Sequence, residues 1–138
     1  DINLEGGLGL WDDLVIRKAE GELDYAMCAN STNALGCLAA SESAGRTDYK
    51  VFGIDDEADQ LAALTKENGI YYATVAQNPF EIGVRVMEAA VHAVEGQDDG
   101  IVKVDGILVT RDTVQEYMAN REKALEELKD YLAIITAS

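Results

Sequence analysis

Two patterns of hydrophobic positions occur along this chain, and they predict where its helices and strands lie. In five stretches apolar residues recur at every third or fourth position, which places them on one face of an α-helix. These predicted helices are Leu8–Ala19, Asn33–Ala44, Glu57–Asn68, Phe80–Glu95 and Thr113–Ile135. Between them lie short runs that are mostly apolar or rich in β-branched and aromatic residues, as is typical of strands. These predicted strands are Leu23–Ala29, Lys50–Ile54, Ile70–Ala76, Ile101–Val104 and Ile107–Thr110.

Strands and helices alternate along most of the chain, with short connections between them. This order predicts an α/β fold with three layers and a mainly parallel sheet. The run Leu23–Ala29 is apolar enough for a strand that is buried on both faces. Ser31 or Thr32 is the expected N-cap of the next helix, and the cluster Gly6-Gly7-x-Gly9 is expected as a flexible lead-in. At 138 residues the chain has the length of one domain.

A polar residue follows each of three predicted strands: Asn30, Asp55 and Gln77. Because the carboxyl ends of parallel strands lie along one edge of a sheet, these side chains can converge on one cleft outside that edge. Two amides and a carboxylate can hydrogen-bond to a neutral polyol without reacting with it. For Asp55 and Asn30 the residues leave a cap or turn role open as well. For Gln77, which lies just before Pro79, they leave open a hinge role through hydrogen bonds to the backbone.

The charge of the chain narrows its range of partners. It carries 11 Lys and Arg against 26 Asp and Glu, a formal net charge of −15. Phosphate contacts need a surplus of Lys and Arg, so this charge argues against binding to nucleic acid and to anionic membranes. No run of the sequence approaches the roughly 18 consecutive apolar residues that a membrane-spanning helix needs.

Groups that could serve catalysis or metal binding are few and scattered. His92 is the only histidine and falls on the polar face of its predicted helix, and no serine lies in a G-x-S-x-G setting. Cys28 and Cys37 are expected as buried free thiols, and Trp11 as a core residue in an apolar helical stripe. Three acidic doublets lack the spacing of a calcium loop: Asp12-Asp13, Asp55-Asp56 and Asp98-Asp99. We therefore expect no catalytic residue, no metal and no cofactor.

Three strings of the chain resemble a known family. They are NSTNALGCLAASESAGRTDYKVFGID, ATVAQNPFEIGVRVMEAAVHAVEGQ and VDGILVTRDTVQEY. In order and spacing they are similar to the second half of the sugar-binding proteins of bacterial ABC transporters, in the ribose- and galactose-binding group with the type I periplasmic fold. The resemblance runs from about Leu8 to Tyr117. It implies two flavodoxin-like lobes joined by three crossovers, with the sugar between them.

The same resemblance implies a role for the strand-end residues. Asn30, Asp55 and Gln77 match the positions from which the carboxy-terminal lobe of the family holds the sugar hydroxyls. Asn30-Ser31 stands where the family usually has Asn-Asp, so a ligand or capping carboxylate is lost. Asp55-Asp56 stands where the family commonly has Asp-Gly. A side chain at Asp56 would narrow the space beside the ligand or add charge there.

The resemblance also divides the chain. Residues 1–77 match the core of the carboxy-terminal lobe, and residues 78–99 match a hinge and a helix that in the family packs on the other lobe. Residues 100–111 match a returning strand segment, and residues 112–138 form an amphipathic helical tail that extends past the usual end of the family. The amino-terminal lobe and the start of the carboxy-terminal lobe have no counterpart. Asp1 follows no initiator Met or signal peptide, so we expect a fragment whose location cannot be read from its start.

The expected function is binding without chemistry. The intact parent would capture a sugar or polyol by hinge closure and deliver it to the membrane permease of an ABC transporter. It would lie outside the cell or in the periplasm, anchored to the membrane as a lipoprotein. The alternative is the effector domain of a LacI-type transcription regulator, although the AQNP and ILVTRDTVQEY strings favour transport. A phosphoacceptor receiver comes third, because Asp55 lacks the lysine and the acidic pair that such a site needs.

The sequence also predicts self-association. Phe80–Glu95 and Thr113–Ile135 each carry an apolar face, and in the family the first of these packs on a lobe that has no counterpart here. Monomers rarely tolerate large exposed apolar patches, because burying apolar area releases roughly 25 cal/mol per Å². We therefore expect a homodimer of this chain with the two helices at its interface.

Overall fold

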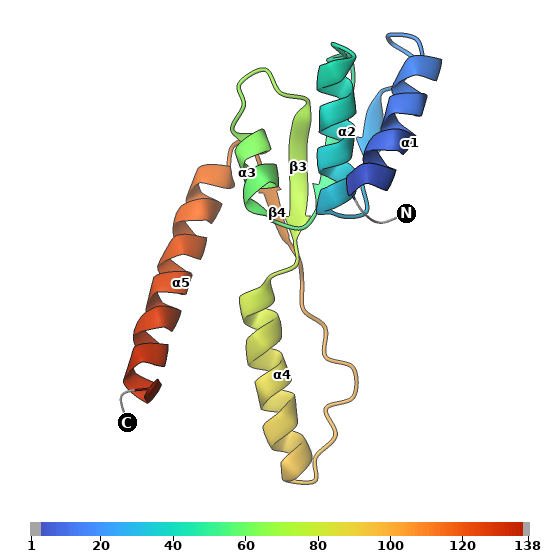
Figure 1. Ribbon diagram of the computed structural model, residues 1–138. Helices are drawn as coiled ribbons and strands as arrows, with labels where there is room; N and C mark the ends of the chain where they lie inside the picture. The colour runs from blue at the N-terminus through green and yellow to red at the C-terminus, as the bar shows by residue number, and fades with distance from the viewer. Residues whose placement is uncertain (1–3, 137–138) are drawn as a thin grey trace.

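The computed structural model describes residues 4–136, which form one sheet with helices on one face and two helices that extend away from it (Figure 1). The helices are α1 (Leu4–Arg17), α2 (Ser31–Ser43), α3 (Ala58–Leu64), α4 (Pro79–Val94) and α5 (Val114–Thr136). The strands are β1 (Tyr25–Met27), β2 (Lys50–Ile54), β3 (Tyr71–Ala76) and β4 (Ile107–Thr110). The predicted alternation of strand and helix is confirmed, with helix and strand ends shifted by a few residues.

The sheet has the strand order β1-β2-β3-β4. Its first three strands are parallel, and β4 runs antiparallel to β3. The α/β class and the mainly parallel sheet are therefore confirmed. Since β1, β2 and β3 run the same way, their carboxyl ends lie along one edge of the sheet.

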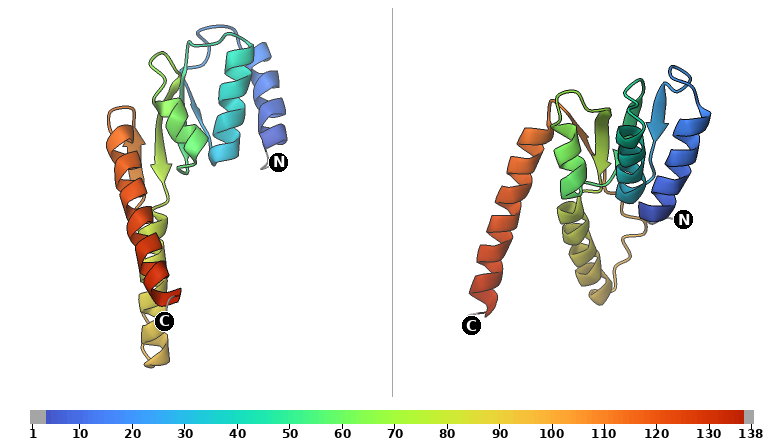
Figure 2. Two further views of the ribbon diagram at one scale, coloured as in Figure 1. Left: turned by 60° about the vertical axis from the view of Figure 1, so that its left-hand side comes forward. Right: turned by 45° about the horizontal axis from the view of Figure 1, so that its top comes forward.

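Helices α2 and α3 pack on one face of the sheet, and α1 packs on α2 (Figures 1 and 2). The hydrophobic core lies between this helical layer and the sheet. Its largest buried apolar side chains come from five elements: Leu61, Leu64, Val51, Tyr71, Val109 and Val114 are all nearly inaccessible to solvent. Trp11 packs against the edge of this core, as predicted.

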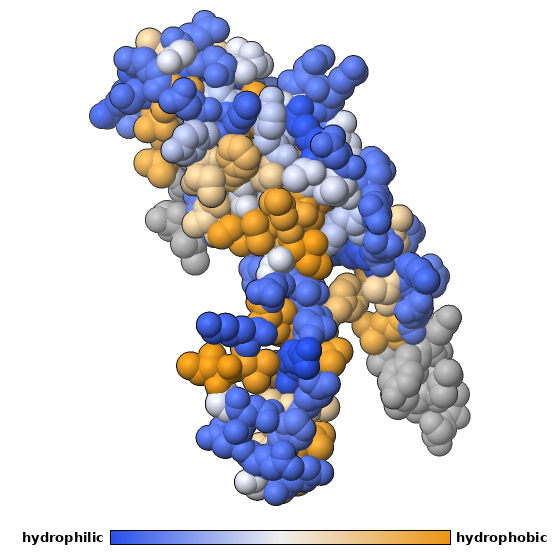
Figure 3. Space-filling model, turned by 180° about the vertical axis from the view of Figure 1, so that it is seen from behind, coloured by the Kyte–Doolittle hydropathy of each residue, from blue (hydrophilic) through white to orange (hydrophobic). Residues whose placement is uncertain are grey.

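The opposite face of the sheet is open. Tyr25 and Met27 of β1 are 66% and 68% exposed, and Ile54, Val75 and Leu108 are exposed on the neighbouring strands. From behind, these apolar side chains form a hydrophobic patch over the sheet (Figure 3). The prediction that Leu23–Ala29 is buried on both faces was therefore wrong, because the described helices that pack on the sheet cover one face only.

Glycines bring α1 and α2 into close contact. A Cβ atom on Gly36 of α2 would lie 2.8 Å from the Leu8 nitrogen and 3.0 Å from the Gly7 carbon of α1. Gly7 and Gly9 lie inside α1, which begins four residues before the predicted helix. The predicted flexible lead-in was therefore wrong: part of the glycine cluster serves close helix packing, where a side chain would not fit.

Two helices extend away from the sheet as arms. Helix α4 follows β3 and extends away from the sheet (Figure 1). It has no buried residue, and its apolar face is exposed at Phe80, Val84, Met87 and Val91. The stretch 101–106 returns alongside α4, with Val102 and Val104 near Ile82 and Val86. It forms no strand in the part of the chain that the structure describes, so the predicted strand Ile101–Val104 was wrong.

Helix α5 begins against the core and then leaves it. Val114 is buried and Tyr117 packs against the core, whereas Met118, Leu125 and Leu128 of the predicted stripe are exposed. Two further members of that stripe, Leu132 and Ile135, lie outside the residues whose side chains are described. Within residues 4–136, no helix is both long and apolar enough to cross a bilayer.

Candidate functional site at the carboxyl edge of the sheet

The structure brings the three predicted site residues to one edge of the sheet. Asn30 follows β1, Asp55 follows β2 and Gln77 follows β3. The Asp55 carboxylate joins the three loops: its Oδ2 accepts a hydrogen bond of 3.0 Å from the backbone N–H of Ser31, and its Oδ1 accepts one from Gln77 Nε2. Asn30 and Asp55 are partly buried, and Gln77 is exposed. The group is therefore polar, preassembled and open to solvent.

Asn30 caps helix α2. Its backbone is extended, and its Oδ1 accepts hydrogen bonds from the Asn33 N–H at 2.9 Å, from Asn33 Nδ2 at 2.9 Å and from the Thr32 hydroxyl at 3.0 Å. The prediction that Ser31 or Thr32 is the cap was therefore wrong, because Ser31 is already the first helical residue and the Asn30 side chain accepts the Asn33 N–H. With its oxygen engaged in the cap, Asn30 can serve a ligand through its amide nitrogen.

The backbone of Asp55 is in an unusual conformation. Its φ angle is +82°, in the left-handed region that side chains other than glycine rarely adopt. Three groups hold it there: its N–H donates to the Val75 carbonyl at 3.0 Å, its carbonyl accepts from the buried Thr74 hydroxyl at 2.7 Å, and its carboxylate meets the Ser31 N–H. Backbone strain of this kind concentrates at functional sites, where the surrounding structure enforces it.

Asp56 is held by a different element, helix α5. Its Oδ2 accepts a hydrogen bond of 2.7 Å from the Tyr117 hydroxyl and lies 3.3 Å from Arg121 Nε, both on α5. Burial, and then the hydrogen bond to this carboxylate, raise the pKa of Tyr117. The Asp56 side chain is therefore engaged by α5, and the expectation that it narrows the space beside the ligand or adds charge there stays a prediction.

Gln77 lies at the start of a turn into α4. Asn78 has φ +55°, and Pro79 occupies the first turn of the helix. The Gln77 side-chain amide donates to the Asp55 carboxylate rather than to hinge backbone. Gln77 therefore belongs to the polar group, while the left-handed Asn78 carries the change of direction.

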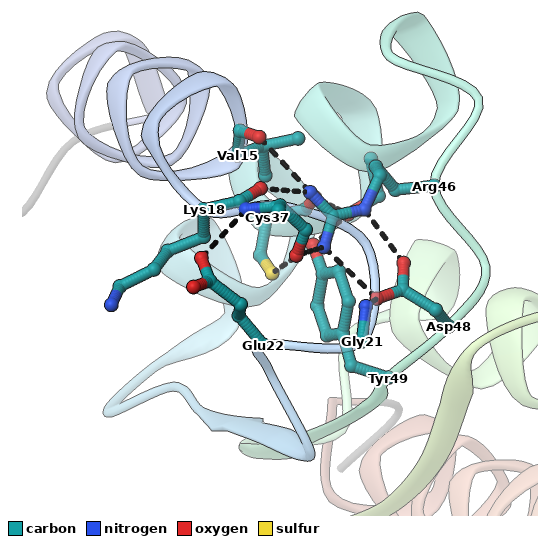
Figure 4. A network of polar contacts seen from close by, with 10 residues as sticks. Val15, Lys18, Gly21, Glu22, Cys37, Arg46, Asp48 and Tyr49 are labelled. Carbon is teal, nitrogen blue, oxygen red and sulfur yellow. Dashed lines mark hydrogen bonds and ion pairs between the residues drawn. The ribbon is translucent and has the colours of Figure 1, made fainter.

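A second polar network lies away from this edge (Figure 4). Arg46 donates to the carbonyls of Val15 at 3.0 Å, Lys18 at 2.6 Å and Ala19 at 3.2 Å, and pairs with Asp48 at 2.6 Å. The Val15 carbonyl lies in the last turn of α1 and the other two directly follow its end, where carbonyls lack a partner within the helix. The hydrogen bonds of Arg46, and that of the Gly21 N–H, hold the pKa of Asp48 well below its usual range. All the guanidinium donors are engaged, so this network is a structural clamp on α1.

The other candidate groups are structural or isolated. Cys28 and Cys37 are free and buried, as predicted, and the hydrogen bond with Cys37 together with burial raises the pKa of Cys28. His92 pairs with Asp99 at 2.8 Å on the surface of α4. Among the described residues, no group of three or more His, Cys, Asp or Glu side chains is placed to hold a metal ion.

Sequence reasoning missed the supporting groups of the site. The Ser31 backbone N–H, the Thr74 hydroxyl and Tyr117 each contact the loop at residues 55 and 56. A polar Thr74 in an otherwise apolar strand is the one signal that pointed to this loop. Backbone donors and a residue 61 positions away leave no local pattern.

Known proteins resemble this chain in sequence and in structure. A family model described as periplasmic binding protein domain matches residues 12–98. The ribose import binding protein RbsB of Salmonella typhimurium is 31% identical over 97 residues, which are 70% of this chain and 31% of that protein. RbsB of Escherichia coli K12 is 32% identical over the same length. The chain thus spans about a third of the length of these curated relatives.

Solved structures agree with the sequence relatives. An ABC transporter solute-binding protein from Bacillus halodurans with bound myo-inositol is 29% identical, with a TM-score of 0.72 over 86% of this chain and 40% of that one. Another, from Agrobacterium vitis with bound allitol, has the same fold at 22% identity, with a TM-score of 0.77 over 85% of this chain and 41% of that one. The family model covers Asn30, Asp55 and Gln77 together with the sheet edge that presents them. This chain belongs to the periplasmic binding protein family.

Proposed function

We propose that this chain is part of a solute-binding protein that captures a sugar or polyol for uptake by an ABC transporter. The observation that carries the proposal is the Asp55 carboxylate, held by the Ser31 N–H and Gln77 at the edge where three parallel strands end. In open α/β sheets, ligands bind outside this edge. The names of the similar proteins, which include ribose import binding proteins, support the same class of ligand.

The chemistry of the three side chains suits a neutral polyol. The Asp55 carboxylate accepts hydrogen bonds from ligand hydroxyls, and the amide nitrogens of Asn30 and Gln77 donate to hydroxyl oxygens. The exposed Gln77–Asp55 hydrogen bond can be exchanged for bonds to a ligand without leaving a buried charge. The three residues offer no nucleophile paired with a base, so the proposed activity is binding and not catalysis.

Hinge closure is the proposed mechanism. We assign residues 1–77 to the lobe core, 78–99 to the hinge and a helix that packs on the other lobe, 100–111 to the returning segment and 112–138 to the tail. The left-handed Asn78 and the fully unburied α4 support a helix that leaves this lobe at residue 78. Contacts made only in the closed state would bias the protein toward closure when ligand binds.

The proposed setting is outside the cytoplasm. The intact parent would be extracellular or periplasmic and anchored to the membrane, with the permease of an ABC transporter as its partner. The relatives that match are import proteins, which supports transport over the LacI-type regulator. The amino-terminal coding region of the parent gene distinguishes the two: a secretory or lipoprotein signal indicates transport, and a helix-turn-helix indicates a regulator.

Titration of the isotope-labelled 138-residue chain with ribose, myo-inositol and allitol tests the binding function by NMR. With half a cleft, we expect dissociation constants of about 1 mM or weaker, near −4 kcal/mol. The backbone amides of Ser31, Asp55 and Gln77 should shift most. A micromolar dissociation constant would contradict the prediction that a second lobe completes the site. Unchanged spectra at a ligand concentration of roughly a hundred times the expected dissociation constant would contradict the proposed function.

A further inference from the structure

The loop after β2 presents two adjacent carboxylates in different directions. Asp55 faces the Ser31 N–H and Gln77 at the proposed ligand site, and Asp56 faces Tyr117 and Arg121 of α5. Because the two residues share one peptide bond, the position of one carboxylate constrains that of the other. Helix α5 is thereby tied to the loop that carries the central side chain of the site.

The contact of Asp56 with α5 is largely buried and satisfied by two partners. The Asp56 side chain is 14% exposed, and a carboxylate this enclosed needs both a charge partner and hydrogen bonds. Arg121 supplies the charge, and the Tyr117 hydroxyl supplies a hydrogen bond of 2.7 Å. Tyr117 packs against the core one turn after the buried Val114, so its hydroxyl is presented from the anchored end of α5.

The backbone of Asp55 needs this support. Its φ of +82° persists only while its neighbours enforce it. Thr74 and Val75 fix the peptide groups of Asp55 from the β3 side, and Tyr117 holds the next residue from the α5 side. If the α5 side is released, residue 55 can relax toward an ordinary negative φ, which would carry its carboxylate away from the Ser31 N–H.

We propose that Asp56 is a positioning residue for ligand binding, which holds the Asp55 carboxylate in place through its contacts with Tyr117 and Arg121 of α5. This inference rests on the proposed function for its effect on affinity, but not for its effect on the Asp55–Ser31 hydrogen bond. Asp56 would then link the ligand site to helix α5. By linkage, ligand binding at Asp55 would also stabilise the docking of α5.

The test uses two variants and a matched control in the 138-residue chain. Tyr117→Phe removes one hydroxyl and keeps the ring, Asp56→Asn removes the charge, and Tyr25→Phe removes an exposed hydroxyl on the open face of the sheet. In the ligand-free protein, the Ser31 amide proton should move upfield in both test variants as its hydrogen bond to Asp55 weakens. It should stay in place in Tyr25→Phe. An unmoved Ser31 amide in Tyr117→Phe and Asp56→Asn would overturn the proposal.

Affinity supplies the second measurement. For ribose and myo-inositol as probes, we expect both test variants to raise the dissociation constant by roughly threefold to tenfold, the usual range for one hydrogen bond. In an Asp55→Asn background the further effect of Tyr117→Phe should disappear, because the two residues act through one carboxylate. Additive effects would overturn the positioning role. If neither probe binds the wild-type chain, the proposed function fails, while the Ser31 amide still decides whether Asp56 positions Asp55.

Discussion

At the scale of single residues, one carboxylate organises the carboxyl edge of the sheet. Asp55 receives a backbone N–H from α2 and a side-chain amide from the end of β3, and its own backbone is held in a left-handed conformation. Asn30 contributes a cap and an amide nitrogen to the same edge. The ligand site is therefore expected to depend more on Asp55 than on either neighbour.

Replacing Asp55 tests that dependence. In the intact protein, Asp55→Ala would leave at least one ligand hydroxyl unpaired, and a lost hydrogen bond to a charged group costs roughly 1.5–3 kcal/mol, or about ten- to hundredfold in affinity. Isothermal titration calorimetry with the cognate sugar measures the loss. Asp13→Ala is the control, because that exposed carboxylate pairs with Arg17 four residues away and lies on α1 rather than in the loop after β2. Equal affinities for wild type and Asp55→Ala would remove Asp55 from the site.

At the scale of elements, two devices hold α1 in place. The Arg46–Asp48 clamp satisfies the carbonyls at its carboxyl end, and the Gly7–Gly36 contact lets its first half approach α2. Both contacts should therefore contribute to the free energy of unfolding, which a variant and a matched control can measure for each.

Glycine substitutions in the two helices should have opposite effects. Gly36→Ala would place a methyl group 2.8 Å from the Leu8 nitrogen, and overpacking of this kind costs about 1–3 kcal/mol. Gly9→Ala on the exposed side of α1 meets no atom within 4 Å and should stabilise the helix by roughly 0.5–1 kcal/mol. Urea denaturation of both variants measures the difference. A Gly36→Ala protein as stable as wild type would show that α1 and α2 can separate without loss.

The clamp should make stability depend on acid. The folded-state pKa of Asp48 is lowered, so its contribution is present above the unfolded-state pKa of about 3.9 and is lost as the pH falls through the folded-state value. Asp48→Asn should therefore be less stable than wild type at pH 7, with the difference shrinking as the pH falls below about 4. Urea midpoints measured from neutral to acidic pH test this, with Asp13→Asn as the exposed control. A pH-independent difference would rule out the linkage.

At the scale of the whole molecule, the chain leaves much apolar surface uncovered. The open sheet face, the apolar face of α4 and the exposed part of the α5 stripe all meet solvent (Figure 3). Burial of these apolar surfaces between two copies would stabilise a homodimer, as the sequence predicts. The net charge of −15 opposes close association of two copies, so apolar burial has to exceed that repulsion.

Light scattering after size exclusion tests the assembly. We expect a dimer of about twice the 14.9 kDa chain mass. Val84→Glu on the exposed face of α4 should return it to a monomer, because it buries an unpaired charge in the proposed interface. Ile16→Glu adds the same charge at an exposed apolar position of α1 and should leave the dimer intact. A folded wild-type monomer at high concentration would contradict the prediction.

Local pattern by itself determined the order of the helices and of the four strands that form the sheet, the class of the fold and the edge at which Asn30, Asp55 and Gln77 meet, although it also predicted a strand at Ile101–Val104 that does not form. Hydrophobic periodicity distinguishes helix from strand, and alternation of the two forces parallel strands whose carboxyl ends share one edge. The strand Lys50–Ile54 was predicted to the residue, and both cysteines were predicted as buried thiols.

Tertiary contacts decided the rest. The apolar run Leu23–Ala29 has one exposed face because the described helices that pack on the sheet lie on its other side, and Gly7 joins a helix because α2 approaches it closely. Asp55, 24 residues away in the chain, accepts the Ser31 N–H, which has no partner within α2. The Asp56 carboxylate contacts α5 because the hydroxyl of Tyr117, 61 residues further along the chain, donates a hydrogen bond to it. Local sequence sets the conformation of a segment, but the partner of a side chain depends on elements that only the folded chain brings together.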